Sequence, residues 1–306
     1  MDCEVLVKSA LTVAILLSGC FFVGFAGEHA RSSAFSSAND QTAVLVGAGD
    51  IADCRDLLGA EATAKLLEQI PGTVMALGDL AYPGGTKQDF ACYDTTWGRV
   101  KSRTRPAPGN HEFHSSGARP YFNYFGPAAG DRQKGYYSYE LGTWHIIVLN
   151  SECKDVGGCG AGSRQEKWLR ADLVAHPVAC TLAYWHKPLF SSGSAHGNDL
   201  TVKPLWEALY EANADVVVNG HDHDYERFAP QTPDGGADPA RGIREFVAGT
   251  GGKGHRPFGP PKPNSESRNA DAFGVLKLTL KSNGYDWQFI AEAGKSFADS
   301  GSGSCH

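Results

Sequence analysis

The feature that most constrains this chain is a short hydrophobic run that ends in two histidines. Residues 214–218 place three consecutive valines after Ala-Asp, a pattern typical of a buried parallel strand. Asn-Gly-His-Asp-His follows at once, so His221 and His223 lie on the loop at the carboxyl end of that strand. Open α/β sheets bind their ligands at this end. The pattern predicts a metal site, although two ordinary loop histidines would give the same local sequence.

The rest of the chain alternates short apolar strands with amphipathic helices. Strands are expected at 44–46, 74–77, 180–185, 216–218 and 245–248, and helices at 61–69, 165–175 and 204–212. Two hairpins are expected, at 136–149 and, through an Asn-Gly turn, at 273–291. This order predicts the α/β class, as a four-layer α/β/β/α sandwich of mixed sheets with the helices outside. Two loop-rich insertions, 230–242 and 254–269, are expected near the rim of the site.

Charge excludes some classes of partner. The formal net charge is -6 and there is no basic cluster. Sequence-independent electrostatic binding to nucleic acid or to an anionic membrane is therefore not expected. A phosphate group would have to be bound locally, by metal.

The N-terminal segment is predicted to be a targeting signal. Residues 9–27 are almost entirely apolar and a Ser-rich polar stretch follows them. We therefore expect a secretory signal at 1–27, a linker at 28–41, one folded domain at 42–297 and a C-terminal tail at 298–306, with the protein extracellular or periplasmic. Two alternatives stay open. Leu17-Ser18-Gly19-Cys20 is like a bacterial lipobox, which would attach a lipid at Cys20, and the apolar run is long enough, at about 20 residues, to remain as a membrane anchor.

The cysteine count agrees with an oxidising compartment. Removal of the signal takes away Cys3 and Cys20 and leaves an even set: Cys54, Cys92, Cys153, Cys159, Cys180 and Cys305. Three disulfides are predicted, and buried free thiols are the alternative. Six cysteines allow about 15 pairings. Cys153 and Cys159 bracket a Gly-rich loop and are natural partners, and Cys54–Cys92 and Cys180–Cys305 are the pairings then favoured.

Five blocks with metal-binding side chains recur in order at strand ends. They are Gly49-Asp50, Gly78-Asp79-Leu80-Ala81-Tyr82, Gly109-Asn110-His111-Glu112, Tyr184-Trp185-His186 and Gly220-His221-Asp222-His223. Two carboxylates, an amide, a phenol and three imidazoles are enough for two metal ions if one carboxylate bridges them. For Tyr82 the alternative is a core tyrosine bonded to backbone.

With these blocks, residues 42–295 resemble the calcineurin-like metallophosphoesterases and, within them, the purple acid phosphatases. The common branch carries Asp-x-His in the first block, whereas this chain has Asp50-Ile51-Ala52. Tyr82 in Gly-Asp-x-x-Tyr takes the place of that histidine and marks the purple acid phosphatases. The resemblance implies the metallophosphoesterase fold for the domain at 42–297. It also implies that 28–41 is too short for the extra β-sandwich of plant-type relatives.

The resemblance further implies a ligand set. Asp50, Tyr82 and His223 would bind one ion, usually ferric iron, and Asn110, His186 and His221 a divalent zinc, manganese or iron. Asp79 would bridge the two. The donors agree with this division, because phenolate and carboxylate oxygens suit a hard trivalent ion and imidazoles a borderline divalent one.

Two ions about 3.5 to 4 Å apart can hold a phosphate ester and supply a metal-bound hydroxide, so no protein nucleophile is needed. By the resemblance, His111 and His196 contact the phosphate or protonate the leaving oxygen. Residue 195 is alanine where many relatives carry a second histidine. His114 could take over that role, and an exposed loop histidine is the alternative for it.

The expected function is hydrolysis of small phosphate monoesters. Hydrolysis of phosphodiesters, including cyclic nucleotides, is the alternative on the same site, and an extracellular binding protein without catalysis is a third possibility. The Gly-rich run at 249–254 lacks the spacing of a phosphate-binding P-loop, so we predict a tight turn there. The sequence leaves the oligomeric state open.

Overall fold

The computed structural model describes residues 42–306, which form one compact unit with two large β-sheets. The signal, the linker and the lipid site predicted at Cys20 lie outside these residues. Among residues 42–306, none of the helices is long and apolar enough to cross a membrane.

The first sheet has six strands, and its parallel part carries the first ligand blocks. Its order is β15 (Ala298–Ser304), β14 (Gly284–Ala291), β13 (Gly274–Lys281), β1 (Ala43–Ala48), β3 (Thr73–Leu77) and β5 (Thr104–Ala107). β1, β3 and β5 are parallel, whereas β13, β14 and β15 pair antiparallel at the other side.

The second sheet has seven strands, in the order β12 (Ser265–Asn269), β10 (Tyr225–Phe228), β11 (Arg244–Ala248), β9 (Val216–Asn219), β8 (Cys180–Tyr184), β7 (Trp144–Val148) and β6 (Tyr137–Leu141). β7, β8, β9 and β11 are parallel. A short parallel pair, β2 (Ala52–Asp53) and β4 (Ala81–Tyr82), lies beside the first sheet.

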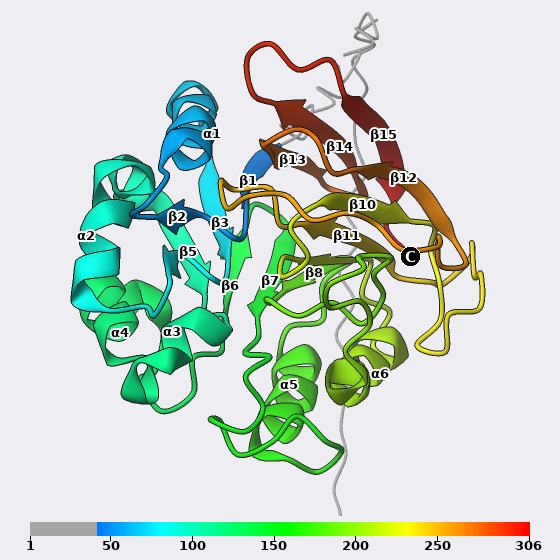
Figure 1. Cartoon of the computed structure of the whole chain (residues 1–306). Helices are drawn as coiled ribbons and strands as arrows, with labels where there is room; N and C mark the ends of the chain where they lie inside the picture. Colours follow the sequence, from blue (N-terminus) through cyan, green and yellow to red (C-terminus); the bar gives the residue numbers. More distant parts are fainter. Residues whose placement is uncertain (1–41) are drawn as a thin grey trace, which may run out of the picture. The chain divides into compact units, whose positions relative to one another are not determined.

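The helices cover the outer faces of the two sheets (Figure 1). They are α1 (Leu58–Gln69), α2 (Lys87–Thr95), α3 (Asn110–His114), α4 (Arg119–Phe125), α5 (Arg164–Ala175) and α6 (Lys203–Glu211), with 3-10 turns at Trp97–Arg103, Ser116–Ala118, Gly126–Ala129 and Leu200–Val202. α1, α2 and α4 pack on the first sheet, and α5 and α6 on the second.

Three buried hydrophobic clusters fill the spaces between these layers. Leu45 on β1 faces Leu182 on β8 in the core between the sheets. The next residue on β1, Val46, points to the opposite face and packs with α1. Val217 on β9 likewise faces Trp206 on α6. The predicted α/β/β/α sandwich of mixed sheets is confirmed.

Residues 298–306 do not form a tail, because Ala298–Ser304 is the edge strand β15. The sequence Ala-Asp-Ser-Gly-Ser-Gly-Ser lacks the β-branched and aromatic residues that signal a strand. The segment pairs because β14 offers a free edge. The glycines of β15 leave room for two large aromatic rings on β14. A Cβ on Gly301 would lie 2.3 Å from the indole of Trp287, and one on Gly303 would lie 2.5 Å from the ring of Tyr285.

The two insertions also differ from expectation. Part of the second, Ser265–Asn269, is the edge strand β12 rather than loop. Its beginning does reach the predicted site, where the Gly254 carbonyl oxygen lies 2.8 Å from Nδ1 of His223. The first insertion runs along α6, where Asp238 accepts a hydrogen bond from Tyr210.

All three favoured disulfides are confirmed: Cys54–Cys92, Cys153–Cys159 and Cys180–Cys305. The third joins the start of β8 in the second sheet to the residue after β15 in the first, across a sequence separation of 125 residues. It therefore fastens an edge strand that has little side-chain packing of its own.

Replacing both Cys180 and Cys305 with serine is expected to lower the free energy of unfolding by about 2–5 kcal/mol, because the bridge closes a long loop in the unfolded chain. Urea unfolding followed by circular dichroism measures the change. The matched control replaces Cys153 and Cys159, which are only 6 residues apart and should have a smaller effect on chain entropy. An equal or larger loss in the control would contradict the loop-length argument.

Candidate metal centre

The predicted site lies where the carboxyl ends of the two parallel strand sets meet. Asp50 and Asp79 follow β1 and β3 of the first sheet, and His221 follows β9 of the second. The backbone N–H of His221 donates to Oδ2 of Asp50 (2.7 Å), and the backbone N–H of Gly49 donates to the carbonyl of Ala248 at the end of β11 (2.9 Å). These bonds join the two sheets directly at the site.

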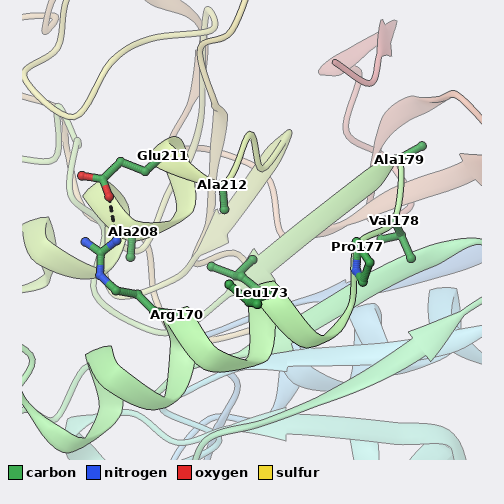
Figure 2. Close-up of a pocket in the computed structure, with 9 residues that line it drawn as sticks. Arg170, Leu173, Pro177, Val178, Ala179, Ala208, Glu211 and Ala212 are labelled. Atoms are coloured by element: carbon green, nitrogen blue, oxygen red, sulfur yellow. Dashed lines mark hydrogen bonds and ion pairs between the residues drawn. The ribbon is translucent and has the colours of Figure 1, made fainter. Parts of the chain in front are cut away.

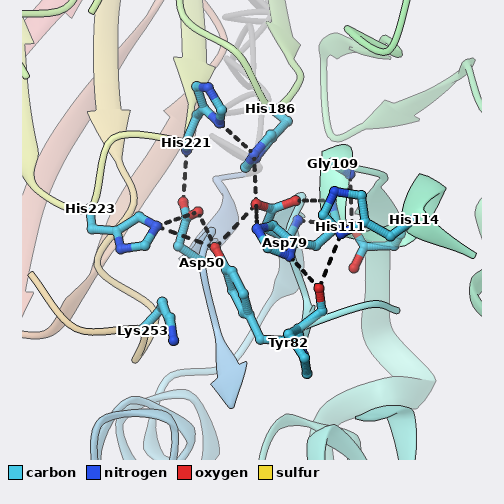
Figure 3. A network of polar contacts seen from close by, with 12 residues as sticks. Asp50, Asp79, Tyr82, Gly109, His111, His114, His186, His221, His223 and Lys253 are labelled. Atoms are coloured by element: carbon cyan, nitrogen blue, oxygen red, sulfur yellow. Dashed lines mark hydrogen bonds and ion pairs between the residues drawn. The ribbon is translucent and has the colours of Figure 1, made fainter. Parts of the chain in front are cut away.

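Six of the side chains predicted as ligands, all except Asn110, converge on this junction (Figure 3). The hydroxyl of Tyr82 donates to Asp50 (2.8 Å) and lies 3.1 Å from Oδ2 of Asp79 and 3.3 Å from Nε2 of His223. Nε2 of His186 lies 3.2 Å from the same Asp79 oxygen and 3.1 Å from Nδ1 of His221. Tyr82 is therefore not a core tyrosine bonded to backbone.

Backbone carbonyl groups orient the imidazoles of His186 and His223. Nδ1 of His186 lies 2.8 Å from the carbonyl oxygen of Leu77, and Nδ1 of His223 lies 2.8 Å from that of Gly254. A carbonyl only accepts, so each Nδ1 carries a proton and each Nε2 points toward the cluster, the orientation of metal-binding histidines. Oδ1 of Asn110 is buried and has no hydrogen-bond partner among residues 42–306, so a cation could satisfy it.

The backbone is strained at three of these residues. Asp50, Asp79 and His221 have positive φ angles of 60°, 52° and 74°. A left-handed conformation costs a residue other than glycine about 1–3 kcal/mol and persists where surrounding structure enforces it, often at functional sites. The loops thus hold these side chains in conformations that a free chain disfavours.

The electrostatics of the cluster favour a bound cation. Burial by itself would lower the pKa of His186, but the charges of Asp79 and then Asp50 raise it to about 10. Burial, reinforced by the same two carboxylates, raises the pKa of the Tyr82 phenol well above its usual range. A phenolate here therefore requires a strong positive charge beside it. Burial and the charge of His186 lower the pKa of His221, which keeps that imidazole neutral and able to bind metal.

Glu112 was not assigned a role from the sequence, yet it shapes the site. This fully buried carboxylate accepts hydrogen bonds from the backbone N–H groups of Asp79 (2.9 Å), Leu80 (2.9 Å) and Gly109 (2.8 Å). It joins the second ligand loop to the third. A glutamate at the third position of a helix is a capping signal, and this local signal could have identified Glu112 at the start of α3.

Two of the three candidate acid histidines, His111 and His196, contact predicted ligands, whereas His114 contacts His111. His111 is 25% exposed, with Nε2 3.7 Å from Asp79 and Nδ1 2.6 Å from the Pro83 carbonyl. The ring of His196 stacks on that of His221 at 4.0 Å between centroids, and burial lowers the pKa of His196. His114 is exposed, and its ring centroid lies 4.7 Å from that of His111.

A hollow lies between two helices that pack on the second sheet. About 720 Å³ opens between α5 and α6, with Leu173, Val178 and the Arg170–Glu211 ion pair among its lining (Figure 2). It adjoins the amino end of β8, opposite the carboxyl ends where the ligand blocks meet. The hollow is therefore separate from the candidate metal centre.

Comparison with known proteins identifies the family. Residues 39–225 match the model of the calcineurin-like phosphoesterases. The chain belongs to this family. Among curated relatives, purple acid phosphatase 15 of Arabidopsis thaliana is 25% identical over 238 residues, which cover 65% of this chain and 43% of that protein. Purple acid phosphatase 21 of the same plant is 30% identical over 253 residues, or 74% of this chain and 55% of that protein. The chain therefore belongs to the purple acid phosphatase-like branch of this family.

Solved structures agree on the fold. A purple acid phosphatase from yellow lupin seeds superposes with a TM-score of 0.74 and 18% identity over 87% of this chain and 54% of that chain. GAP50, the anchor in the inner membrane complex of Plasmodium, gives 0.68 and 14% identity over 87% and 89% of the two chains. The chain spans about half the length of the curated relatives it matches.

Proposed function

We propose that this phosphoesterase is a secreted, dinuclear metal-dependent phosphatase that hydrolyses phosphate monoesters. The observation that carries the proposal is the convergence of six of the seven donors predicted from the sequence, which come from loops and strands of both halves of the molecule. Secretion is supported by three disulfides, which persist in oxidising compartments.

The geometry supports two ions with Asp79 between them. Oδ2 of Asp79 lies 3.1 Å from the Tyr82 hydroxyl on one side and 3.2 Å from Nε2 of His186 on the other. One carboxylate thus contacts a member of each predicted ligand set. In this proposal Asp50, Tyr82 and His223 would hold ferric iron, and Asn110, His186 and His221 would hold divalent zinc, manganese or iron.

When bound, such ions supply Lewis acidity that polarises phosphoryl oxygens and lowers the pKa of water. The protein's own part is to hold the ester and move a proton. The backbone N–H of His111 donates to Oδ1 of Asp79 (2.8 Å), and the Pro83 carbonyl keeps the imidazole proton on Nδ1. Nε2 of His111 lies on the side of Asp79, at 3.7 Å. With a second proton bound there, it would donate a hydrogen bond to a phosphoryl oxygen, which can only accept. In this proposal His196 protonates the leaving oxygen, which is supported by its stacking on His221.

Substrate preference tests this proposal against its alternatives. With iron and zinc supplied, turnover of an aryl phosphate should exceed that of the corresponding bis-aryl ester by at least about tenfold, equal to about 1.4 kcal/mol in the barrier. Faster turnover of the diester would identify a phosphodiesterase instead. If neither ester is cleaved while elemental analysis finds two metal ions per chain, the protein is a binding protein without catalysis.

A further inference from the structure

The segment 251–254 forms hydrogen bonds to residues of the candidate metal centre. It is part of the Gly-rich run for which the sequence predicted a tight turn. The N–H of Gly251 donates to the carbonyl of Gly49 (2.8 Å), and the N–H of Lys253 donates to the carbonyl of Asp50 (2.8 Å). The carbonyl of Gly254 accepts from Nδ1 of His223 (2.8 Å). These four residues thus fix the backbone of one predicted ligand and the imidazole of another.

The side chain of Lys253 reaches a third ligand. Its ammonium lies 5.0 Å from the centroid of the Tyr82 ring, over the ring face, and forms an ion pair with Asp53. Asp53 on β2 is directly opposite Tyr82 on β4 in the two-stranded sheet. The Lys253 and Asp53 side chains are only 23% and 5% exposed, so the contact is largely shielded from water.

Asp53 does not fully neutralise the Lys253 ammonium, because it also pairs with a second cation. Arg55 already binds that carboxylate through two hydrogen bonds, of 2.9 Å from Nε and 2.6 Å from Nη2. Two cations therefore share one carboxylate, and the three charges sum to a net positive charge beside the Tyr82 ring. A cation over an aromatic face is attracted to its electron density, and most strongly when the ring carries negative charge.

We infer that Lys253 is a positioning residue that tunes Tyr82 as a metal ligand, by withdrawing electron density from the ring while the 251–254 segment holds Asp50 and His223. The inference rests on the proposed function, since it requires ferric iron on Tyr82. Lys253 would lower the energy of the phenolate electrons of Tyr82. Lys253 itself touches neither the substrate nor the metal.

The visible charge-transfer band of the iron-loaded protein reports this effect. Light moves an electron from the phenolate to the iron, so a cation beside the phenolate raises the energy required. In Lys253→Met, of similar length without charge, the band should move to longer wavelength by on the order of 10 nm. Lys253→Arg keeps the charge and should hold the band near its wild-type position. The control Lys65→Met removes an exposed lysine on α1 and should leave the band unchanged.

The outcomes separate the inference from the function on which it rests. A wild-type band that does not move in Lys253→Met overturns the tuning role, even if the melting temperature falls, because a purely structural lysine would change stability alone. An iron-loaded wild type without any band overturns the assignment of Tyr82 to ferric iron, and with it the inference. If Lys253→Met does not fold, Lys253→Gln carries the same expected shift.

Discussion

Asp79→Asn is expected to lower kcat for an aryl phosphate by about a thousandfold or more, equal to at least about 4 kcal/mol in the barrier. Oδ2 of Asp79 lies between the Tyr82 hydroxyl and Nε2 of His186. A neutral amide cannot hold two cations together, because its nitrogen is a donor and it brings no charge. Turnover should be measured together with the metal content of the purified variant.

The matched control for this change is Asp286→Asn, which removes a carboxylate on β14 that pairs with Lys281. It should keep wild-type turnover. Circular dichroism should show both variants folded. Retention of more than about a tenth of wild-type turnover in Asp79→Asn, a loss of under about 1.4 kcal/mol, would rule out the two-metal mechanism.

The iron-loaded protein should be pink to purple, and Tyr82→Phe should remove that colour completely. A phenolate bound to ferric iron absorbs visible light by charge transfer, and none of the other proposed ligands gives such a band. The Tyr82 side chain is only 2% exposed, and phenylalanine retains its ring, so the fold should persist. Visible absorption of wild type and variant at equal iron content measures the effect.

Tyr93→Phe is the control for the loss of a buried phenol. Tyr93 is fully buried, and its hydroxyl has no hydrogen-bond partner within residues 42–306. This variant should keep the band unchanged. A colourless wild type, or a band that survives in Tyr82→Phe, would show that Tyr82 is not a ligand. Placement in the calcineurin-like phosphoesterases would stand, because it rests on residues 39–225 as a whole.

The elements that the sequence predicted well are those with strong local signals. The strand at 216–218 and the helix at 204–212 correspond to β9 and α6 within one or two residues. Consecutive valines and helical spacing of apolar residues are properties of a short segment, so no distant contact is needed to read them. β15 has no such signal and depends on the edge of β14.

The sequence by itself determined which donors the candidate site contains, because donor identity and position at a strand end are both local. Tertiary structure alone decided how these donors are held. Asp50 and His221 are 171 residues apart, and the bond between them joins two sheets. Lys253 and Asp53 are separated by 200 residues. Contacts over such distances form only when the sheets pack face to face, since the order of residues along a chain does not encode which strand ends will meet.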